Sequence, residues 1–182
     1  MSTKQVTTVG LGAALMAVFS QISIPIPNVP LTFQLFGVVL LGIILPKKLS
    51  TLSLCVFVLL GAVGVPVFAG FKGGLSILVG ATGGYLYSFV LAVYIVGAFS
   101  AKKNIICTIF GAYLGIGVSY ILGTIQLKYV VGMSWATAIS AGTGAGVFLI
   151  KDIILVGVAI IVGRKIQTIL KQSGIFDKEL LA

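Results

Sequence analysis

The chain has no histidine and very few charged residues. Of its 182 residues only 8% are charged, with three acids against 12 lysines and arginines, whereas a soluble domain carries roughly 25% charged residues. A water-soluble fold of this length would have too little polar side-chain surface to cover itself. The absence of histidine also removes the commonest general base and metal ligand. The composition therefore disfavours a soluble domain, an enzymatic centre and a metal site.

Cysteine and phosphate-binding motifs are equally scarce. Cys55 and Cys107 each stand in the middle of a separate apolar run. Two widely spaced, buried thiols favour packing over a disulfide or a metal centre. The motif GxxxxGK[ST], which cradles nucleotide phosphates, is missing because no lysine directly follows a glycine. The sequence thus predicts no cofactor, no metal and no ATP-binding element of its own.

What the chain does have is apolar length. Apolar residues make up 59% of it, and the mean hydropathy is +1.23. A membrane-spanning helix needs about 20 mostly apolar residues. The sequence therefore predicts an all-α integral membrane protein in which residues 1–182 form a single six-helix transmembrane domain with irregular outer loops. The expected spans are 6–24, 32–45, 49–66, 79–101, 104–126 and 143–164.

The positive charges indicate an orientation. With the N-terminus in the cytoplasm, alternating spans place nine basic residues on the inner side and three on the outer side. Basic residues favour the cytoplasmic side of a membrane, so the net charge of +9 fits an anionic inner leaflet better than a nucleic acid. Both termini are expected in the cytoplasm. The inner residues are Lys4, Lys47, Lys48, Lys102, Lys103, Arg164, Lys165, Lys171 and Lys178, and the outer residues are Lys72, Lys128 and Lys151.

The segments expected on the outer side have unusual composition. Residues 24–32 contain three prolines, which favour an extended path, and residues 65–85 contain six glycines. Residues 126–142 carry lysine, tyrosine and tryptophan, which are typical of a membrane interface. Irregular backbone at membrane depth is tolerated only where protein or a cavity satisfies it, so we expect a pocket on the outer side. The glycines either wrap a ligand closely or allow tight packing of the loop.

Asp152 is the only acid within an expected span. It precedes Arg164 by twelve residues, or about 18 Å at 1.5 Å per residue, which places it in the outer half of the hydrocarbon region. An acid at that depth is costly and usually marks a site, while an internal ion pair or a protonated, hydrogen-bonded acid would also explain it. Phe148 shares its helix face. Lys151 points about 100° away and either contacts a ligand or extends toward the outer interface.

Small residues form a stripe on the first expected span. Ala13 and Ala17 are four residues apart, a spacing that lets another helix approach closely. The approaching helix belongs either to this chain or to a separate membrane subunit. Gly111 and Gly115 repeat the spacing, and there packing within the chain is the preferred interpretation. The full stripe on the first span is Gly10, Ala13, Ala14 and Ala17.

Two strings carry a family resemblance. PxxPLTFQLFGVVLLG, from residue 27 to 42, and GAVGVPVFAGFKGGLSILVGATGGYLYSF, from 61 to 89, resemble the BioY family, with weaker similarity through Gly111–Gly115, Tyr120 and 148–152. Members of that family are the biotin-specific substrate-binding (S) subunits of energy-coupling factor (ECF) transporters. In the family pattern a lysine follows the acid by three residues. This chain has Leu155 at that position and a lysine directly before the acid.

The resemblance implies a fold, a function and partners. It implies six helices, high-affinity capture of biotin from outside, and coupling to a transmembrane subunit and two ATPase subunits. It also implies that Ala13 and Ala17 face the transmembrane subunit. The function favoured is binding of biotin at the outer face of the bacterial cell membrane and its delivery for uptake. The alternative is an autonomous facilitator or secondary carrier, although no inverted repeat is evident. An intramembrane enzyme is disfavoured because the chain has no nucleophile–base pair.

The chemistry of biotin suggests a role for each candidate residue. Its ureido ring offers two N–H donors, which Asp152 could accept, and a carbonyl, which loop amides, Thr82 or Tyr85 could meet. Phe68 and Phe148 suit its apolar rings, and a lysine, at 72 or 151, suits its carboxylate. The candidate ligand-binding residues are therefore Phe68, Gly70, Lys72, Gly73, Gly74, Thr82, Gly83, Gly84, Tyr85, Tyr120, Phe148, Lys151 and Asp152.

Overall fold

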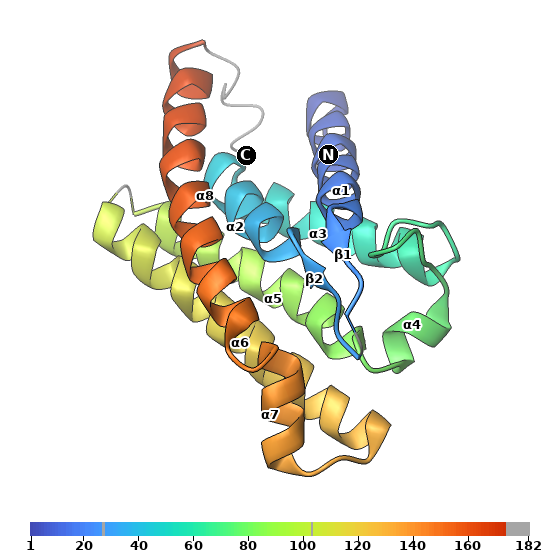
Figure 1. Cartoon of the computed structure of the whole chain (residues 1–182). Coiled ribbons are helices and arrows are strands. Elements are labelled where there is room, and N and C mark those ends of the chain that lie inside the picture. Colours follow the sequence, from blue (N-terminus) through green and yellow to red (C-terminus); the bar gives the residue numbers. More distant parts are fainter. Residues whose placement is uncertain (27, 103, 174–182) are drawn as a thin grey trace.

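Helices make up most of the computed structural model, which describes residues 1–26, 28–102 and 104–173 (Figure 1). An antiparallel hairpin of two short strands, β1 (Ser23–Ile24) and β2 (Leu31–Thr32), follows the first helix. Two helices are short, α4 (Leu75–Val79) and α7 (Trp135–Thr143). The long helices are α1 (Thr3–Gln21), α2 (Gln34–Ile44), α3 (Lys47–Ala62), α5 (Gly83–Ser100), α6 (Ile105–Val131) and α8 (Val147–Gln172).

Each expected span overlaps one of the long helices. In the described part of the chain, α5 and α6 are by themselves long and apolar enough to cross a membrane, and α7 with α8, bent by 42°, would make a third span. The chain is therefore a multi-pass helical membrane protein. Crossing by all six long helices stays a prediction, because α2 has only 11 residues and α1 and α3 do not pass the same test.

The segment 126–142 is mostly helical, so the expectation of an irregular outer segment there was wrong. α6 continues past Gln126 and ends at Gly132, whose left-handed backbone (φ 73°) is a common helix stop. A new helix begins at Trp135, and the side chain of the preceding residue, Ser134, accepts a hydrogen bond from the Thr137 N–H. A lysine and aromatic residues near the interface are thus compatible with helix.

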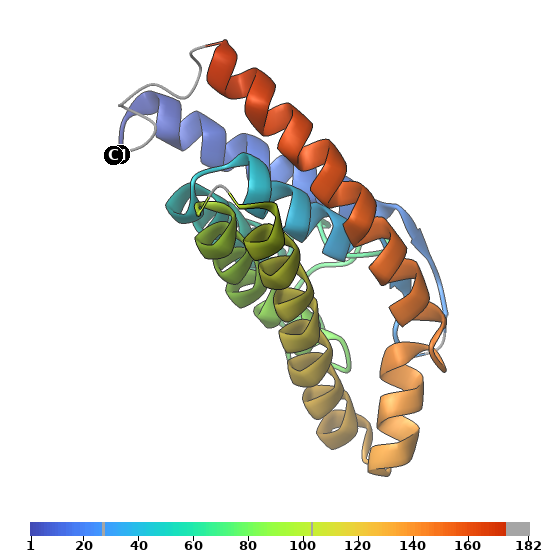
Figure 2. The ribbon, with the colours of Figure 1, turned by 90° about the vertical axis from the view of Figure 1, so that its left-hand side faces the viewer.

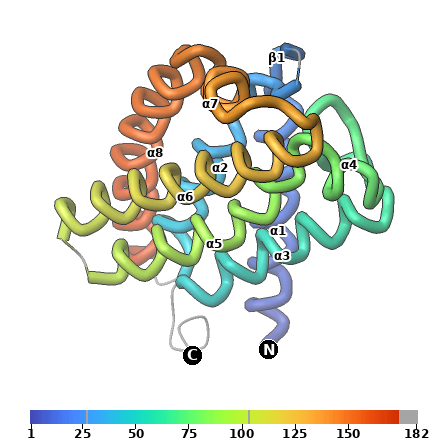
Figure 3. Tube along the Cα trace, turned by 90° about the horizontal axis from the view of Figure 1, so that it is seen from below, coloured from blue at the N-terminus to red at the C-terminus, as the bar shows by residue number. Residues whose placement is uncertain are grey.

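The short helix α2 lies at the centre of the bundle (Figure 3). It packs against α1, α3, α5 and α8, and nine of its 11 residues are buried. Gly42 allows the close approach of α5, since a Cβ there would lie 2.8 Å from Val96. Gly163 of α8 faces Ile43 in the same way, at 3.1 Å. Packing around α2 therefore sets the positions of α5 and α8.

α5 and α6 form an antiparallel pair (Figure 2). Gly111 lies against Phe99, and a Cβ on Gly115 would meet the Ala92 carbonyl at 3.2 Å. The Gly111–Gly115 pair therefore packs within the chain, as predicted, and lets the two helices approach closely. α6 extends beyond α5 and reaches α7.

The small-residue stripe of α1 is divided between two faces. Ala13 is 3% exposed and belongs to the core, whereas Gly10 and Ala14 are exposed and Ala17 is half-buried. On the buried side, Gly12 lies against Ser53 of α3. Ala13 therefore packs inside the chain, and the small residues on the outward face are Gly10 and Ala14.

The irregular segments and most of the basic residues occupy opposite ends of the molecule (Figure 1). The β-hairpin, the loop of residues 65–74, α4 and α7 lie at one end, which we call the loop end. The first residues of α1, the α2–α3 and α5–α6 turns and the last turns of α8 lie at the other, the basic end. Lys103 and Lys178 fall outside the described residues. The basic end carries Lys4, Lys47, Lys48, Lys102, Arg164, Lys165 and Lys171.

Labelling of single cysteines will test the predicted orientation. In a background with Cys55 and Cys107 replaced by serine, Lys102→Cys should be protected from a membrane-impermeant maleimide added to intact cells. Val131→Cys, at the other end of α6, should react, because basic ends favour the cytoplasm. Both cysteines should react once the cells are opened. Reaction at position 102 from outside intact cells would contradict the orientation.

Candidate ligand-binding site

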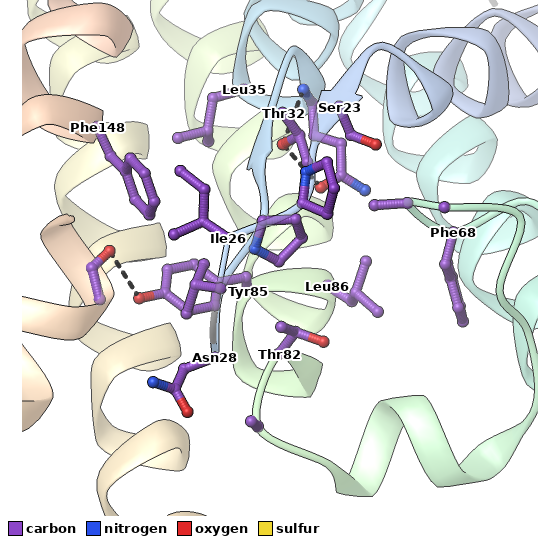
Figure 4. A pocket seen from close by; sticks show the side chains of 18 of the residues that line it. Ser23, Ile26, Asn28, Thr32, Leu35, Phe68, Thr82, Tyr85, Leu86 and Phe148 are labelled. Atoms are coloured by element: carbon purple, nitrogen blue, oxygen red, sulfur yellow. Dashed lines mark hydrogen bonds between the residues drawn. The ribbon is translucent and has the colours of Figure 1, made fainter.

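A cavity of about 550 Å³ lies at the loop end, within the range of roughly 300–1,000 Å³ that is usual for small-molecule sites. Figure 4 shows Phe148 of α8 and Phe68 of the 65–74 loop on opposite sides of it. Thr82, Tyr85 and Leu86 lie between them, at the start of α5. Segments far apart in the sequence therefore enclose one largely apolar space.

The charged centre of the cavity is an ion pair between neighbouring residues of α8. Asp152 is 2% exposed, and its Oδ1 lies 2.7 Å from Lys151 Nζ. Tyr120 donates its hydroxyl to Asp152 Oδ2 at 2.6 Å, and Lys151 Nζ donates to the Thr32 carbonyl at 2.5 Å. Lys151 thus does not extend to the outer interface but bends back and joins α8 to β2. The internal ion pair foreseen for Asp152 is present, and the acid also lines the cavity.

Asp152 retains unused acceptor capacity. A carboxylate offers about four lone-pair positions. Oδ1 is buried and, although Lys151 is close, it accepts no hydrogen bond of good geometry from the described residues. Taking two charges out of water is unfavourable unless further hydrogen bonds satisfy them. A ligand with N–H groups would supply such bonds.

Two tyrosines join the charged centre to the neighbouring helices. The rings of Tyr85 and Tyr120 are perpendicular, with centroids 6.4 Å apart. Tyr85 donates its hydroxyl to the Gly142 carbonyl at 3.2 Å, which connects α5 to α7. Its ring lies directly on Gly123 of α6, where any side chain would collide with it. Tyr85 therefore forms a fixed wall, with its hydroxyl already engaged by the protein.

The turn of residues 68–72 forms the opposite wall. Phe68 and Lys72 exchange main-chain hydrogen bonds of 2.9 and 3.2 Å. Between them Gly70 and Phe71 have positive φ angles of 71° and 55°. A positive φ is uncommon for a phenylalanine, so the surroundings must stabilise this conformation of Phe71. The Phe68 ring is 2% exposed and packs edge-on against Phe57 of α3 at 5.5 Å.

Gln21, the last residue of α1, supplies much of that support. Its Nε2 donates to the carbonyls of Val67 and Phe68, both at 3.2 Å. Its Oε1 accepts the N–H of Phe71 at 2.9 Å. One side-chain amide thus connects the end of α1 to the wall of the cavity. No local pattern in the sequence indicated this role, because the partners are about 50 residues away.

Nine of the predicted residues line the cavity, and four glycines do not. Gly73 lies against the main chain of Val65, and Gly74 donates its N–H to the Gly61 carbonyl and has φ 99°. Gly83 and Gly84 lie against main-chain carbonyls of α4 and α6. These four glycines therefore allow tight packing of the loop, which was the alternative to contact with a ligand. The nine lining residues are Phe68, Gly70, Lys72, Thr82, Tyr85, Tyr120, Phe148, Lys151 and Asp152.

The proline segment contributes a wall that the residue predictions missed. Gln34, at the start of α2, is 7% exposed and donates to Ser20 Oγ at 3.0 Å, while it accepts the Thr32 hydroxyl at 3.0 Å. These bonds fix β2 beside the cavity. The three prolines and their expected outer position were the available signal. The lining residues of this wall are Ser23, Pro25, Ile26, Asn28, Val29, Pro30, Thr32, Gln34 and Leu35.

A multi-pass helical chain with a largely apolar cavity around a partly buried ion pair belongs to the class of membrane proteins that bind a small ligand. Residues 1–172 match the BioY family. The chain is 38% identical over 167 residues to the probable biotin transporter BioY of Pyrococcus horikoshii, covering 92% of this chain and 98% of that protein. It is 44% identical over 133 residues to the biotin transporter BioY of Thermotoga maritima, covering 70% and 76%. The chain therefore belongs to the BioY family, a family of transporters and not of enzymes.

The fold is similar to a crystal structure of the S-component for biotin from an ECF-type ABC transporter. The TM-score is 0.82, and the alignment covers 92% of this chain and 95% of that one at 24% identity. At this identity the match shows the fold. It supports the predicted helical membrane architecture independently of the sequence strings.

Replacement of Gln21 will test its support of the 65–74 loop. Gln21→Ala removes two donated hydrogen bonds and one accepted bond, each worth about 1 kcal/mol. We expect amide exchange at Phe71 to accelerate by at least about tenfold, as measured by hydrogen–deuterium exchange of the purified protein. Gln167→Ala is the matched control, because Gln167 Nε2 also donates to a main-chain carbonyl, that of Ile43, at the basic end. Equal amide exchange at Phe71 in Gln21→Ala and in the parent would show that the turn of residues 68–72 is stable without Gln21.

Proposed function

We propose that this chain binds biotin in the loop-end cavity and delivers it for uptake as the S subunit of an ECF-type ABC transporter. The observation that carries the proposal is the ion pair of the partly buried Lys151 and the buried Asp152, which lines the cavity of a BioY-family chain. The names of the relatives from P. horikoshii and T. maritima support biotin as the substrate. Because the sequence has no phosphate-binding motif, a transmembrane coupling subunit and two ATPase subunits would supply the energy.

In this proposal the ureido ring of biotin meets the ion pair. Asp152 accepts its N–H groups, and a charged hydrogen bond of this kind is worth about 1.5–3 kcal/mol. Lys151, whose ammonium lies 2.7 Å from the acid, offers its remaining ammonium proton to the ureido carbonyl. The ring system lies between Phe68 and Phe148, which stand on opposite sides of the cavity (Figure 4). Aromatic walls with few convergent polar groups are typical of small-molecule sites.

The carboxylate of biotin is assigned to Lys72. Lys151 is already engaged by Asp152 and by the Thr32 carbonyl, whereas Lys72 lines the cavity and is exposed at its rim. A flexible ammonium at the rim can follow the carboxylate without being buried. This arrangement places the polar ring deep and the carboxylate near the opening, with the loop end facing outward.

The exposed small residues of α1 are the proposed contact for the coupling subunit. Gly10 and Ala14 lie on the outward face of the helix, and small residues allow a partner helix to approach closely within a membrane. The same helix ends at Gln21, which holds the wall of the cavity. A contact between the coupling subunit and Gly10 or Ala14 would thus be linked to the loop-end cavity through α1 alone.

Biotin titration of the purified chain will test the proposed ligand and the role of Asp152. The parent should bind biotin, and Asp152→Asn should weaken binding by roughly tenfold to a thousandfold, at 1.4 kcal/mol per decade, because the charge and one acceptor are lost. Calorimetry measures both affinities. Tyr113→Phe is the control, since it removes a hydrogen bond to the Ile153 carbonyl on the exterior of α8. If the parent does not bind biotin, the proposed function is wrong. If Asp152→Asn binds biotin as tightly as the parent, Asp152 has a structural role and does not contact the ligand.

Bulky replacements on α1 will test the docking surface. Ala14→Trp should reduce biotin uptake by cells that co-express the coupling subunits at least about tenfold, because the partner helix cannot approach. Biotin binding by the isolated chain should be unchanged. Ile121→Trp, on an exposed face of α6, is the control for a bulky residue elsewhere. Ala13→Trp should impair binding as well, since Ala13 is in the core. If Ala14→Trp lowers binding and uptake together, the outward face of α1 is not a docking surface.

A further inference from the structure

The connection between α6 and α7 carries a cluster of side chains that the proposed binding of biotin does not use. The Lys128 ammonium lies 4.1 Å from the centre of the Tyr129 ring and 4.9 Å from the centre of the Trp135 ring. The two rings meet edge to face, with centroids 6.2 Å apart. Tyr129 and Trp135 are nevertheless exposed, at 69% and 48%. We call Lys128, Tyr129 and Trp135 the α6–α7 cluster.

The length of α6 places this cluster at a membrane boundary. The helix has 27 residues and is therefore about 40 Å long at 1.5 Å per residue, whereas the hydrocarbon core is about 30 Å thick. A usual tilt of about 20° does not remove this excess. Since α6 begins at the basic end, its last turn, with Lys128 and Tyr129, reaches the head-group layer at the loop end. In Figure 1 the connection to α7 projects beyond the β-hairpin and α4.

The helix α7 has a small buried face and a large exposed one. Ala138 and Gly142 are buried, and the Gly142 carbonyl accepts the Tyr85 hydroxyl at 3.2 Å. Trp135 and Ile139, which are also four residues apart and so share a face, are 48% and 53% exposed. The small face thus packs on the protein, and the large apolar face is turned away from it. A helix of this kind suits the plane of a membrane interface.

The polar groups of the cluster match lipid head groups. The ammonium of Lys128 and the indole N–H of Trp135 can only donate hydrogen bonds, and residues 126–146 include no acid that could pair with Lys128. Phospholipids present phosphate and ester oxygens at this depth, and tryptophan and tyrosine favour the same layer because their rings are apolar at one end and polar at the other. Water could accept the hydrogen bonds, but it would leave Trp135 and Ile139 as an exposed apolar patch.

We propose that the α6–α7 cluster binds phospholipid head groups in the leaflet at the loop end. Lys128 donates to phosphate oxygens, the Trp135 indole donates to ester oxygens, and Ile139 contacts the upper acyl chains. Because Gly142 of the same helix holds Tyr85 in the wall of the loop-end cavity, this contact sets the height of the cavity relative to the lipid. The proposal depends neither on biotin nor on which leaflet the loop end faces.

The depth of the cluster can be measured because Trp135 is the single tryptophan of the chain. The purified chain is reconstituted into phosphatidylcholine vesicles that contain lipids with a nitroxide either on the head group or in the middle of an acyl chain. We expect the head-group label to quench Trp135 more strongly than the mid-chain label. Ile121→Trp in a Trp135→Phe background is the depth reference, because position 121 is exposed on α6 and lies seven residues, or about 10 Å, before Lys128. There the mid-chain label should quench more strongly.

The role of Lys128 can be measured with the same fluorescence. Brominated phosphatidylglycerol should replace phosphatidylcholine beside Trp135 with about fivefold preference, as expected from one lysine near a membrane surface. Lys128→Gln should abolish this preference. Lys102→Gln is the matched control, because it removes the same charge near the other end of α6 and should leave the preference unchanged. Circular dichroism verifies that each variant keeps its helical content.

Three outcomes would overturn the proposal. Quenching of Trp135 by aqueous iodide but by neither labelled lipid would place the cluster in water. Stronger quenching by the mid-chain label than by the head-group label would place it in the hydrocarbon layer. An equal preference for phosphatidylglycerol in Lys128→Gln and in the parent would exclude Lys128 from contact with the head groups.

Discussion

The structure depends on one constraint of the membrane, that main-chain groups between helices must find hydrogen-bond partners inside the protein. Long side chains meet this demand at each break in the helical pattern. Gln21 bonds the 65–74 loop, and Gln126 donates to the carbonyls of Leu78 and Gly80 beside α4. Lys151 donates to β2 and Gln167 to the end of α2. The irregular segments that enclose the loop-end cavity are therefore ordered by donors on helices far away in the sequence.

This dependence explains what the sequence could and could not predict. Hydropathy located the long helices, because apolar length is a local property. It ended the fifth span at 126, since Lys128 and Tyr129 look like a loop, although the helix stops only at Gly132. The role of each glycine in residues 65–85 was also ambiguous. Gly70 lines the cavity, while Gly83 makes room for a carbonyl of the same chain, and composition does not separate a glycine that faces a ligand from one that faces backbone.

The charged centre shows a further limit. Consecutive residues on a helix point about 100° apart, so the sequence left open an internal ion pair for Asp152 without indicating Lys151 as its partner. The four-carbon lysine side chain is long enough to turn back, so its ammonium lies 2.7 Å from Asp152 Oδ1. A similar difference of one position separates Ala13, in the core, from Ala14, on the surface. Helix period alone indicated small residues at this height of α1 but not which of them faces outward.

The shortness of α2 has an electrical consequence. Its 11 residues span only about 16 Å at 1.5 Å per residue, roughly half of a hydrocarbon core of about 30 Å. Two cavities lie at its two ends, each lined by apolar residues together with some polar ones. The insulating layer at the centre of the protein is then Val38, Val39, Leu41 and Ile43, all 1% exposed or less. A membrane voltage would fall mainly across these four side chains, so a charged group moving past α2 would cross most of the field within three turns of helix.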